Sequence, residues 1–183
     1  MDNLRVVVDT REQTPLEPFV LEKGARVHLP TVRRKLEVGD YGLDGHDELV
    51  MLERKSIADF WSTITHGRDR FCAELLRAVE AHKADPSKYA RRYVVIEGGW
   101  NDLDMYMITR GHGVPLSRIN ANVTALSIDY HVDFVWCEKY GREEAEWFVG
   151  FVLQRLWEQM NDAKAAKKAA ERGLDLPWGK VPA

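Results

Sequence analysis

The sequence predicts an α/β fold in which helices cover a central sheet. Short runs of β-branched residues alternate with amphipathic helical segments, and an early pair of these runs is joined by an Asp-Gly turn. The chain has 183 residues, which is enough for one domain with a substantial core. We expect this domain to span residues 1–160, with a polar helical extension and tail at 161–183.

The strands of the first half are predicted from their β-branched residues and from the turn signals between them. Leu4–Asp9 is expected to be a buried strand, and a polar loop with prolines follows it at 10–18. Further strands are predicted at 26–29, 33–38, 40–43 and 49–54. The last two form a hairpin, because Asp-Gly in the turn at 44–47 strongly favours that connection.

The helices are predicted from capping signals and from apolar residues at helical spacing. Ser56 and Asp59 suggest a capping box ahead of a helix that ends near Thr65. Other helices are expected at 68–83, from Ser117 to about 130 and at 142–160, with strands at 93–97 and 132–136. The segment 101–110 is ambiguous and fits a helical turn.

Composition excludes several classes of protein. The net charge of −3 leaves no global basic field, so a nucleic-acid partner would be held by local basic patches or by metal. Cys72 and Cys137 lack CxxC spacing, which argues against a disulfide framework or a zinc site and favours a reducing compartment. Neither a signal peptide nor a membrane-spanning run is visible, so we expect an intracellular protein without a membrane partner.

Acidic residues are expected to gather at the ends of the predicted strands. Asp9 ends the first strand, Asp40 begins the hairpin and Glu53 lies near the end of the return strand. Lys55 leaves the same face of that strand as Glu53, because side chains alternate, whereas Arg54 points the other way. Converging carboxylates repel unless a cation lies between them. The pattern therefore predicts a divalent-metal site with a lysine beside it, suited to a phosphodiester.

Spacing alone leaves an equal alternative, in which Asp40 is a turn residue and Glu53 and Lys55 form a solvated charge pair. The longer string favours the metal site. Gly39-Asp40, Glu53-Arg54-Lys55 and Asp59 together resemble the GD…ERKxxxD signature of the XPF-type (ERCC4-like) structure-specific endonucleases. The run from Val8 to Glu12 resembles the strand and loop that precede this signature, and the clear resemblance covers about 4–72.

The resemblance implies a restriction-endonuclease-like, PD-(D/E)xK fold, with a mixed central sheet flanked by helices. It also implies a metal-dependent DNA endonuclease that uses Mg²⁺ or Mn²⁺ to cut branched or flapped duplex DNA. The implied metal ligands are Asp40, Glu53, the carbonyl of Arg54 and Asp9, while Lys55 would position or activate the attacking water. Glu12, Arg54 and Asp59 have supporting roles, and the Arg54 side chain is expected to pair with Asp59 or another acid.

Basic residues near these motifs are candidates for contacts to DNA phosphates. They are Arg33, Arg34, Arg68 and Arg70. The expectation is firmest for Arg68, because it opens a helix, whose N-terminus attracts anions. For Arg33 and Arg34 a solvated strand edge is the alternative, and we favour that reading for Arg91 and Arg92.

The chain departs from the family after Met160, where members usually carry a tandem helix-hairpin-helix domain. A nuclease domain alone, or a fragment, is therefore expected. Stand-alone forms are similar to phage or prokaryotic versions, which weakly favours a cytoplasmic location. The apolar stripe of the helix at 142–160 could pair two copies as a homodimer or cover the sheet. A same-fold nuclease of restriction or recombination type and a non-catalytic DNA-binding scaffold remain as alternative functions.

Overall fold

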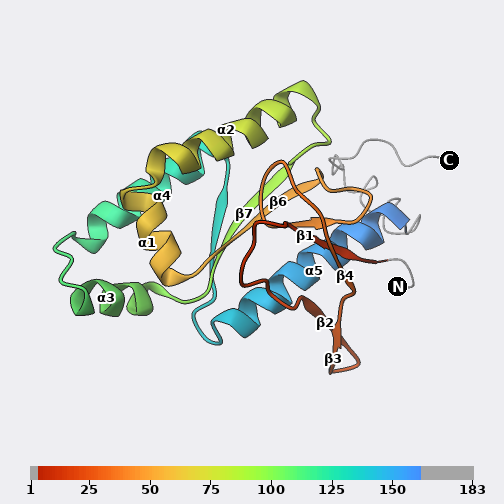
Figure 1. Ribbon diagram of the computed structural model, residues 1–183, viewed down its shortest axis with the longest axis horizontal. Coiled ribbons are helices and arrows are strands. Elements are labelled where there is room, and N and C mark those ends of the chain that lie inside the picture. Colours follow the sequence, from red (N-terminus) through yellow and green to blue (C-terminus); the bar gives the residue numbers. More distant parts are fainter. Residues whose placement is uncertain (1–3, 162–183) are drawn as a thin grey trace, which may run out of the picture.

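A six-stranded mixed sheet forms the centre of the molecule (Figure 1). The computed structural model describes residues 4–161. The strands of this sheet are β1 (Val6–Val8), β4 (Thr31–Arg33), β5 (Tyr41–Leu43), β6 (Val50–Lys55), β7 (Arg91–Ile96) and β8 (Asp133–Trp136), in the spatial order β4-β1-β5-β6-β7-β8. The pairs around β5 are antiparallel, whereas β6, β7 and β8 run parallel. The predicted hairpin is confirmed, and Tyr41 pairs with Leu52 in it.

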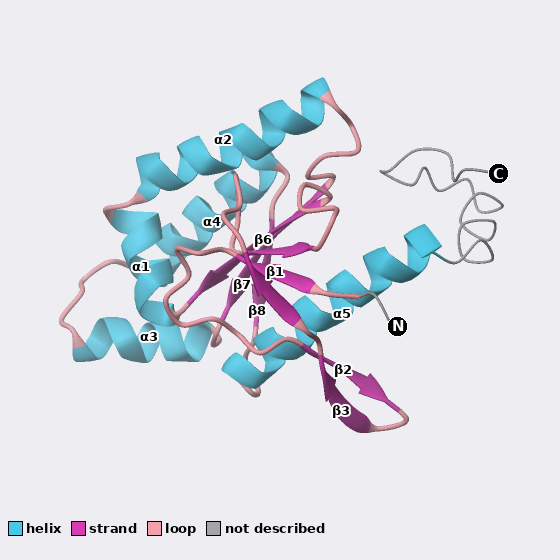
Figure 2. Ribbon diagram, turned by 45° about the vertical axis from the view of Figure 1, so that its right-hand side comes forward, coloured by secondary structure: helices cyan, strands magenta, loops and turns pink. Residues whose placement is uncertain are grey.

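Helices cover both faces of the sheet, as Figures 1 and 2 show. On one face lie α1 (Ile57–Thr65), α2 (Arg68–Ala84), α3 (Trp100–Thr109) and α4 (Leu116–Tyr130), and on the other lies α5 (Arg142–Asn161). The side chains of β6 alternate between the two layers. Met51 is buried under α1–α4, whereas Val50 and Leu52 are buried under α5. This alternation decides where the charged end of β6 points.

A small hairpin packs against α5, and the sequence analysis predicted only its second strand, at 26–29. It consists of β2 (Phe19–Glu22) and β3 (Ala25–His28), and Figure 2 shows it projecting below the main sheet. Gly150 of α5 makes the contact possible, since a Cβ there would lie 2.1 Å from the carbonyl oxygen of Phe19. Strand β2 was overlooked because it follows the prolines of the loop and only two of its four residues are buried.

The strand predicted at 33–38 is wrong in its bounds, because β4 ends at Arg33. Beyond it, the amide of Leu36 donates to the side chain of Asp9 instead of to a neighbouring strand, which ends the ladder. The ambiguous segment at 101–110 is helix α3. Ser117 does not cap α4, since that helix begins at Leu116 after Pro115.

Arg92 is buried, which contradicts the expectation of a solvated edge. Strand β7 lies inside the sheet between β6 and β8. The Arg92 guanidinium donates to the carbonyls of Tyr89, Tyr130 and His131, and so holds the end of α4 against the sheet.

Three other expectations concern the chain as a whole. Cys72 and Cys137 are both free thiols, as predicted. No helix within residues 4–161 is long and apolar enough to cross a membrane. Helix α5 continues to Asn161, and the rest of the predicted extension and tail lies outside the described residues.

Candidate active site

The β5–β6 hairpin fixes the position of Asp40. Gly39 precedes it with a φ of +79°, and a Cβ at that position would lie 3.1 Å from the carbonyl oxygen of Leu52. The close approach lets the Asp40 amide donate to that same oxygen at 2.8 Å. In return, the amide of Arg54 donates to Oδ2 of Asp40 at 2.8 Å. Asp40 is thereby tied to β6 at the residue between Glu53 and Lys55.

Glu53 and Lys55 leave β6 on the face covered by α1–α4. They form an ion pair between the Lys55 ammonium and Oε1 of Glu53. The ammonium also lies 5.3 Å from the ring centroid of Phe71, on the first turn of α2. Both side chains are largely buried. The predicted pairing of one acid and one lysine on the same face is therefore present.

Burial and nearby charges disfavour the ionised forms of both carboxylates of this cluster. Burial, and then the neighbouring charge of Glu53, raise the pKa of Asp40 well above its ordinary value of 3.8. The pKa of Glu53 is also raised, mainly by burial, although Lys55 acts in the opposite direction. Burial lowers the pKa of Lys55, but the attraction of Glu53 outweighs it and leaves the pKa raised. Lys55 is thus a stable ammonium, and it lies beside acids whose ionised forms are disfavoured by burial.

These residues suit a divalent cation. Within residues 4–161, no three His, Cys, Asp or Glu side chains are placed to bind an ion by themselves. Mg²⁺ does not require such a cage, because it usually binds one or two carboxylates together with water and substrate phosphate. Burial, with a contribution from neighbouring acids, raises the pKa values of Asp40 and Glu53, and a bound cation would favour the ionised form of both. The carbonyl of Arg54, between them and Lys55, is a further oxygen of the right kind.

Asp9 holds the loop before the site instead of opening into it. Its carboxylate accepts from the amide, Nε and Nη2 of Arg11 and from the amide of Leu36, at 2.6–3.0 Å. Burial raises the pKa of Asp9, but the hydrogen bonds from Arg11 and Leu36 prevail, and the pKa lies below 3.8. The Asp9 side chain is 1% exposed. Its backbone still adjoins the site, because its amide donates to the carbonyl of Asp40 at 2.8 Å.

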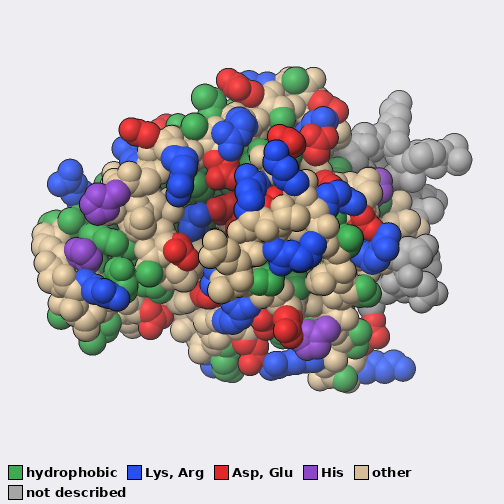
Figure 3. All heavy atoms as spheres, viewed as in Figure 1, with side chains coloured by type: hydrophobic (Ala, Val, Ile, Leu, Met, Phe, Trp, Pro, Cys, Tyr) green, Lys and Arg blue, Asp and Glu red, His purple; other side chains and the backbone are tan. Residues whose placement is uncertain are grey.

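An open cleft of about 650 Å³ joins these residues to solvent. It is lined by acids, basic residues and small polar residues, namely Arg11, Glu12, Gln13, Thr14, Asp40, Glu53, Arg54, Lys55, Asp59, Ser62, Thr63 and Arg70. Figure 3 shows the same character on this side of the molecule, where Lys and Arg side chains surround a small group of acidic ones near the middle of the face. Such a surface suits an anionic ligand with a metal ion at its centre.

Arg54 pairs with Glu97, and not with Asp59. Its guanidinium meets the Glu97 carboxylate through two bonds of 2.8 Å, from Nε and from Nη2. Asp59 instead accepts from the hydroxyl of Ser56 at 2.6 Å, and its amide donates back to Ser56 at 3.1 Å. The predicted cap of α1 is thereby confirmed.

The sequence analysis gave no role to Glu97, Arg142 or Arg11. Arg142, at the start of α5, donates to Oε1 of Glu97 at 3.2 Å and to the carbonyls of Thr14 and Pro15. One signal for Glu97 was available. It directly follows β7, which runs parallel to β6, so it emerges at the same edge of the sheet as Lys55.

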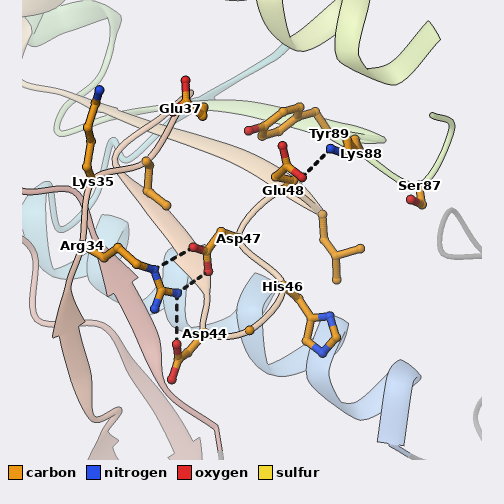
Figure 4. A pocket seen from close by; sticks show the side chains of 13 residues that line it. Arg34, Lys35, Glu37, Asp44, His46, Asp47, Glu48, Ser87, Lys88 and Tyr89 are labelled. Atoms are coloured by element: carbon orange, nitrogen blue, oxygen red, sulfur yellow. Dashed lines mark hydrogen bonds and ion pairs between the residues drawn. The ribbon is translucent and has the colours of Figure 1, made fainter. Parts of the chain in front are cut away.

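The four predicted phosphate contacts lie in different settings. Arg70 is exposed and lines the cleft, and Arg68 has a buried Nε with no hydrogen-bond partner within residues 4–161. Arg33 Nη2 instead donates to the carbonyls of the loop at 9–12. Arg34 lies at the other end of β5, where Figure 4 shows it held by Asp44 and Asp47.

Comparison with known proteins agrees with this geometry. The sequence matches the ERCC4 domain family over residues 8–151. The fold is similar to XPF from Aeropyrum pernix, with a TM-score of 0.56 at 19% identity, covering 94% of this chain and 82% of that one. XPF from the same organism in complex with DNA gives a TM-score of 0.53 at 21% identity, covering 89% and 69%. No curated protein matches the chain in sequence. The fold is restriction-endonuclease-like, as expected.

Proposed function

Because the chain belongs to the ERCC4 domain family of XPF-type nucleases, we propose that it is a metal-dependent endonuclease that cuts branched or flapped duplex DNA. One observation carries the proposal. Asp40, which is partly buried, and Glu53, which is buried, line one open cleft together with the Lys55 ammonium, and the charge of Glu53 helps to raise the pKa of Asp40. A protein that only binds DNA gains nothing from two such acids, which repel the phosphate backbone.

The residues of the cleft divide the chemistry among them. Asp40, Glu53 and the carbonyl of Arg54 would hold Mg²⁺ or Mn²⁺, which when bound polarises the phosphate and lowers the pKa of a coordinated water. Lys55 carries a fixed positive charge where negative charge grows in the transition state. We assign Asp9 the task of fixing the loop that presents Arg11 and Glu12 to the cleft.

Contacts to DNA outside the reacting phosphate would come from Arg68 and Arg70. Arg70 is exposed at the cleft, and the unpartnered Nε of Arg68 is available to a phosphate once the side chain turns outward. Arg33 and Arg34 already have partners, so we give them no more than a secondary role. We also propose a homodimer, because Trp147 and Phe151 of α5 remain exposed even though α5 covers the sheet.

The test is cleavage of a panel of end-labelled DNAs in Mg²⁺, Mn²⁺ or EDTA. The panel contains a flap, a fork, a linear duplex and a single strand. We expect cutting of the flap or fork in the presence of metal and none in EDTA. Equal cutting of every substrate would favour a nuclease of restriction or recombination type, and no cutting of any would favour a DNA-binding scaffold. Asp40→Ala and Lys55→Ala serve as inactive controls.

A further inference from the structure

Arg54 contributes to the cleft in two opposed ways. Its backbone amide and carbonyl belong to the acidic cluster, since the amide donates to Asp40. Its guanidinium is a positive charge that would compete with a metal ion for any acid of the cleft that it pairs with closely. In a site built for a cation, such a side chain must be held away from the carboxylates.

Glu97 provides this restraint. The two parallel bonds of 2.8 Å engage Nε and Nη2 of Arg54, which is the strongest geometry open to a guanidinium and a carboxylate. Arg54 and Glu97 both lie on the α5 face of the sheet, opposite Glu53 and Lys55, because side chains alternate along β6. Their side chains are 10% and 12% exposed, so water screens the pair weakly.

Glu12 is the second acid near the Arg54 guanidinium, whose Nη1 donates to the hydroxyl of Thr14 at 2.8 Å. Its Oε1 lies 3.8 Å from Nη1 of Arg54, and it already accepts from the amide of Thr14 at 2.7 Å. Glu12 also faces the acidic cluster, because its charge contributes to raising the pKa values of Asp40 and Glu53. If Arg54 moved to form a short, hydrogen-bonded ion pair with Glu12, the negative charge of Glu12 would be neutralised. A positive charge would also lie closer to the site of the cation.

We propose that Glu97 is a positioning residue that keeps the Arg54 guanidinium in a bidentate pair, so that its contact with Glu12 stays a long ion pair of 3.8 Å and the acids of the cleft are left to a divalent cation. This inference rests on the proposed function. Arg142 strengthens the arrangement, since its guanidinium binds Glu97 Oε1 and the carbonyls of Thr14 and Pro15. The end of β7, the start of α5 and the loop after Glu12 are thereby joined around one carboxylate.

The experiment measures Mn²⁺ binding by electron paramagnetic resonance in the absence of DNA. Glu97→Gln removes the charge and keeps the shape of the side chain. We expect it to weaken Mn²⁺ binding by roughly 10- to 100-fold, as for other residues that orient a metal site from outside. Glu146→Gln is the matched control, because Glu146 pairs with Arg142 at 3.3 Å and has no contact with Arg54 within residues 4–161. It is expected to bind Mn²⁺ as the wild type does.

The double variant E97Q/R54M separates this role from a purely structural one. Removing the competing guanidinium should restore Mn²⁺ binding to within about threefold of the wild type. If the pair only supported the fold, the double variant would bind no better than Glu97→Gln, and the proposal would be overturned. Should Glu97→Gln fail to fold, the double variant decides alone, and loss of Mn²⁺ binding in its folded form refutes the idea.

Measurements on the wild type distinguish a failure of the proposed nuclease function from a failure of the role proposed for Glu97. If the wild type binds no Mn²⁺ and cuts no DNA, the proposed function fails and this inference fails with it. If the wild type binds Mn²⁺ and Glu97→Gln binds it equally well, the role of Glu97 alone is refuted.

Discussion

The backbone amide of Arg54 donates a hydrogen bond to the carboxylate of Asp40 across the β5–β6 hairpin, at 2.8 Å. This bond holds the first acid of the cleft against the strand that carries the second acid and the lysine. A local feature, the left-handed Gly39, brings the two strands close enough for it. The cleft therefore depends on the hairpin more than on any helix, and the predictions below start from the crowded charges that the hairpin creates.

Stability of the metal-free protein should fall as the pH rises above about 4. Asp40 and Glu53 have raised pKa values in the folded state, compared with ordinary values of 3.8 and 4.5. Between the unfolded and folded pKa values the folded protein binds more protons, so a rise in pH favours unfolding. Asp40→Asn should flatten this dependence and stabilise the metal-free protein at pH 7 by about 1 kcal/mol. Urea unfolding at several pH values measures it.

Added Mg²⁺ should oppose this loss of stability at higher pH, because the ion binds the ionised carboxylates of the folded state and not those of the unfolded chain. The expected result is a rise in the unfolding midpoint of the wild type at pH 7 and no rise for Asp40→Asn. A wild-type stability that increases steadily from pH 4 to pH 7 without metal would contradict raised pKa values of the two acids in the folded state.

Asp9→Asn should destabilise the fold by about 2 kcal/mol, because the hydrogen bonds that its buried carboxylate accepts from Arg11 and Leu36 would be weakened. The pH dependence has the opposite sign to that of Asp40. The folded pKa of Asp9 is lowered, so its contribution is present above 3.8 and is lost as the pH falls through the folded value. Thermal unfolding at pH 7 gives the magnitude.

A second measurement separates the structural role of Asp9 from a role as metal ligand. If Asp9 mainly holds the loop, a folded Asp9→Asn protein should bind Mn²⁺ within a few-fold of the wild type. Complete loss of Mn²⁺ binding without loss of stability would instead make Asp9 a ligand, as the family resemblance implies.

Arg70→Ala should weaken DNA binding and reduce the slope of log K against log salt by about 1, because one phosphate contact is lost. Arg34→Ala is the matched control, since Arg34 is held by Asp44 and Asp47 away from the cleft. Fluorescence anisotropy with a fork DNA in EDTA, over a range of salt concentrations, measures both. Equal slopes for the two variants would remove Arg70 from the DNA contact.

The sequence predicts much of this architecture because its strongest signals are local. The Asp-Gly turn, the Ser56 cap and the apolar runs of β6 and β7 can each be recognised within a few residues, and all are confirmed. The pairing of Glu53 with Lys55 followed from alternation along a single strand. What could not be foreseen depends on distant contacts. The hydrogen bond from the Leu36 amide to Asp9 joins residues 27 positions apart, and the role of Asp9 as a metal ligand stays a prediction.

The same reason explains the other omissions. Glu97 gains its role from Arg54, 43 positions earlier, and from Arg142, 45 positions later. Strand β2 packs against α5, so its own sequence is a poor guide to it, whereas β3 was predicted. Arg92 was expected to be solvated because the sequence does not show that β8 pairs with β7 and makes β7 an inner strand of the sheet.

The last prediction concerns the outer face of α5. Ala145, Val149 and Leu153 are buried against the sheet, so the apolar stripe does cover it. Trp147 and Phe151 nevertheless remain exposed, and their rings stack with centroids 5.4 Å apart. Exposed aromatic pairs of this kind are typical of interfaces. If two copies pair here, Phe151→Asp should convert a dimer to a monomer in light scattering, since it would bury a charge.

Ile128→Asp is the control for the dimer test, because Ile128 is 66% exposed on α4, on the other side of the sheet. It should leave the dimer intact. The Phe151→Asp monomer should still bind Mn²⁺, because Asp40 directly precedes β5 and Glu53 belongs to β6, so neither acid lies on α5. A wild-type monomer at micromolar concentration, or a Phe151→Asp protein that stays dimeric, would show that this aromatic pair does not join two copies.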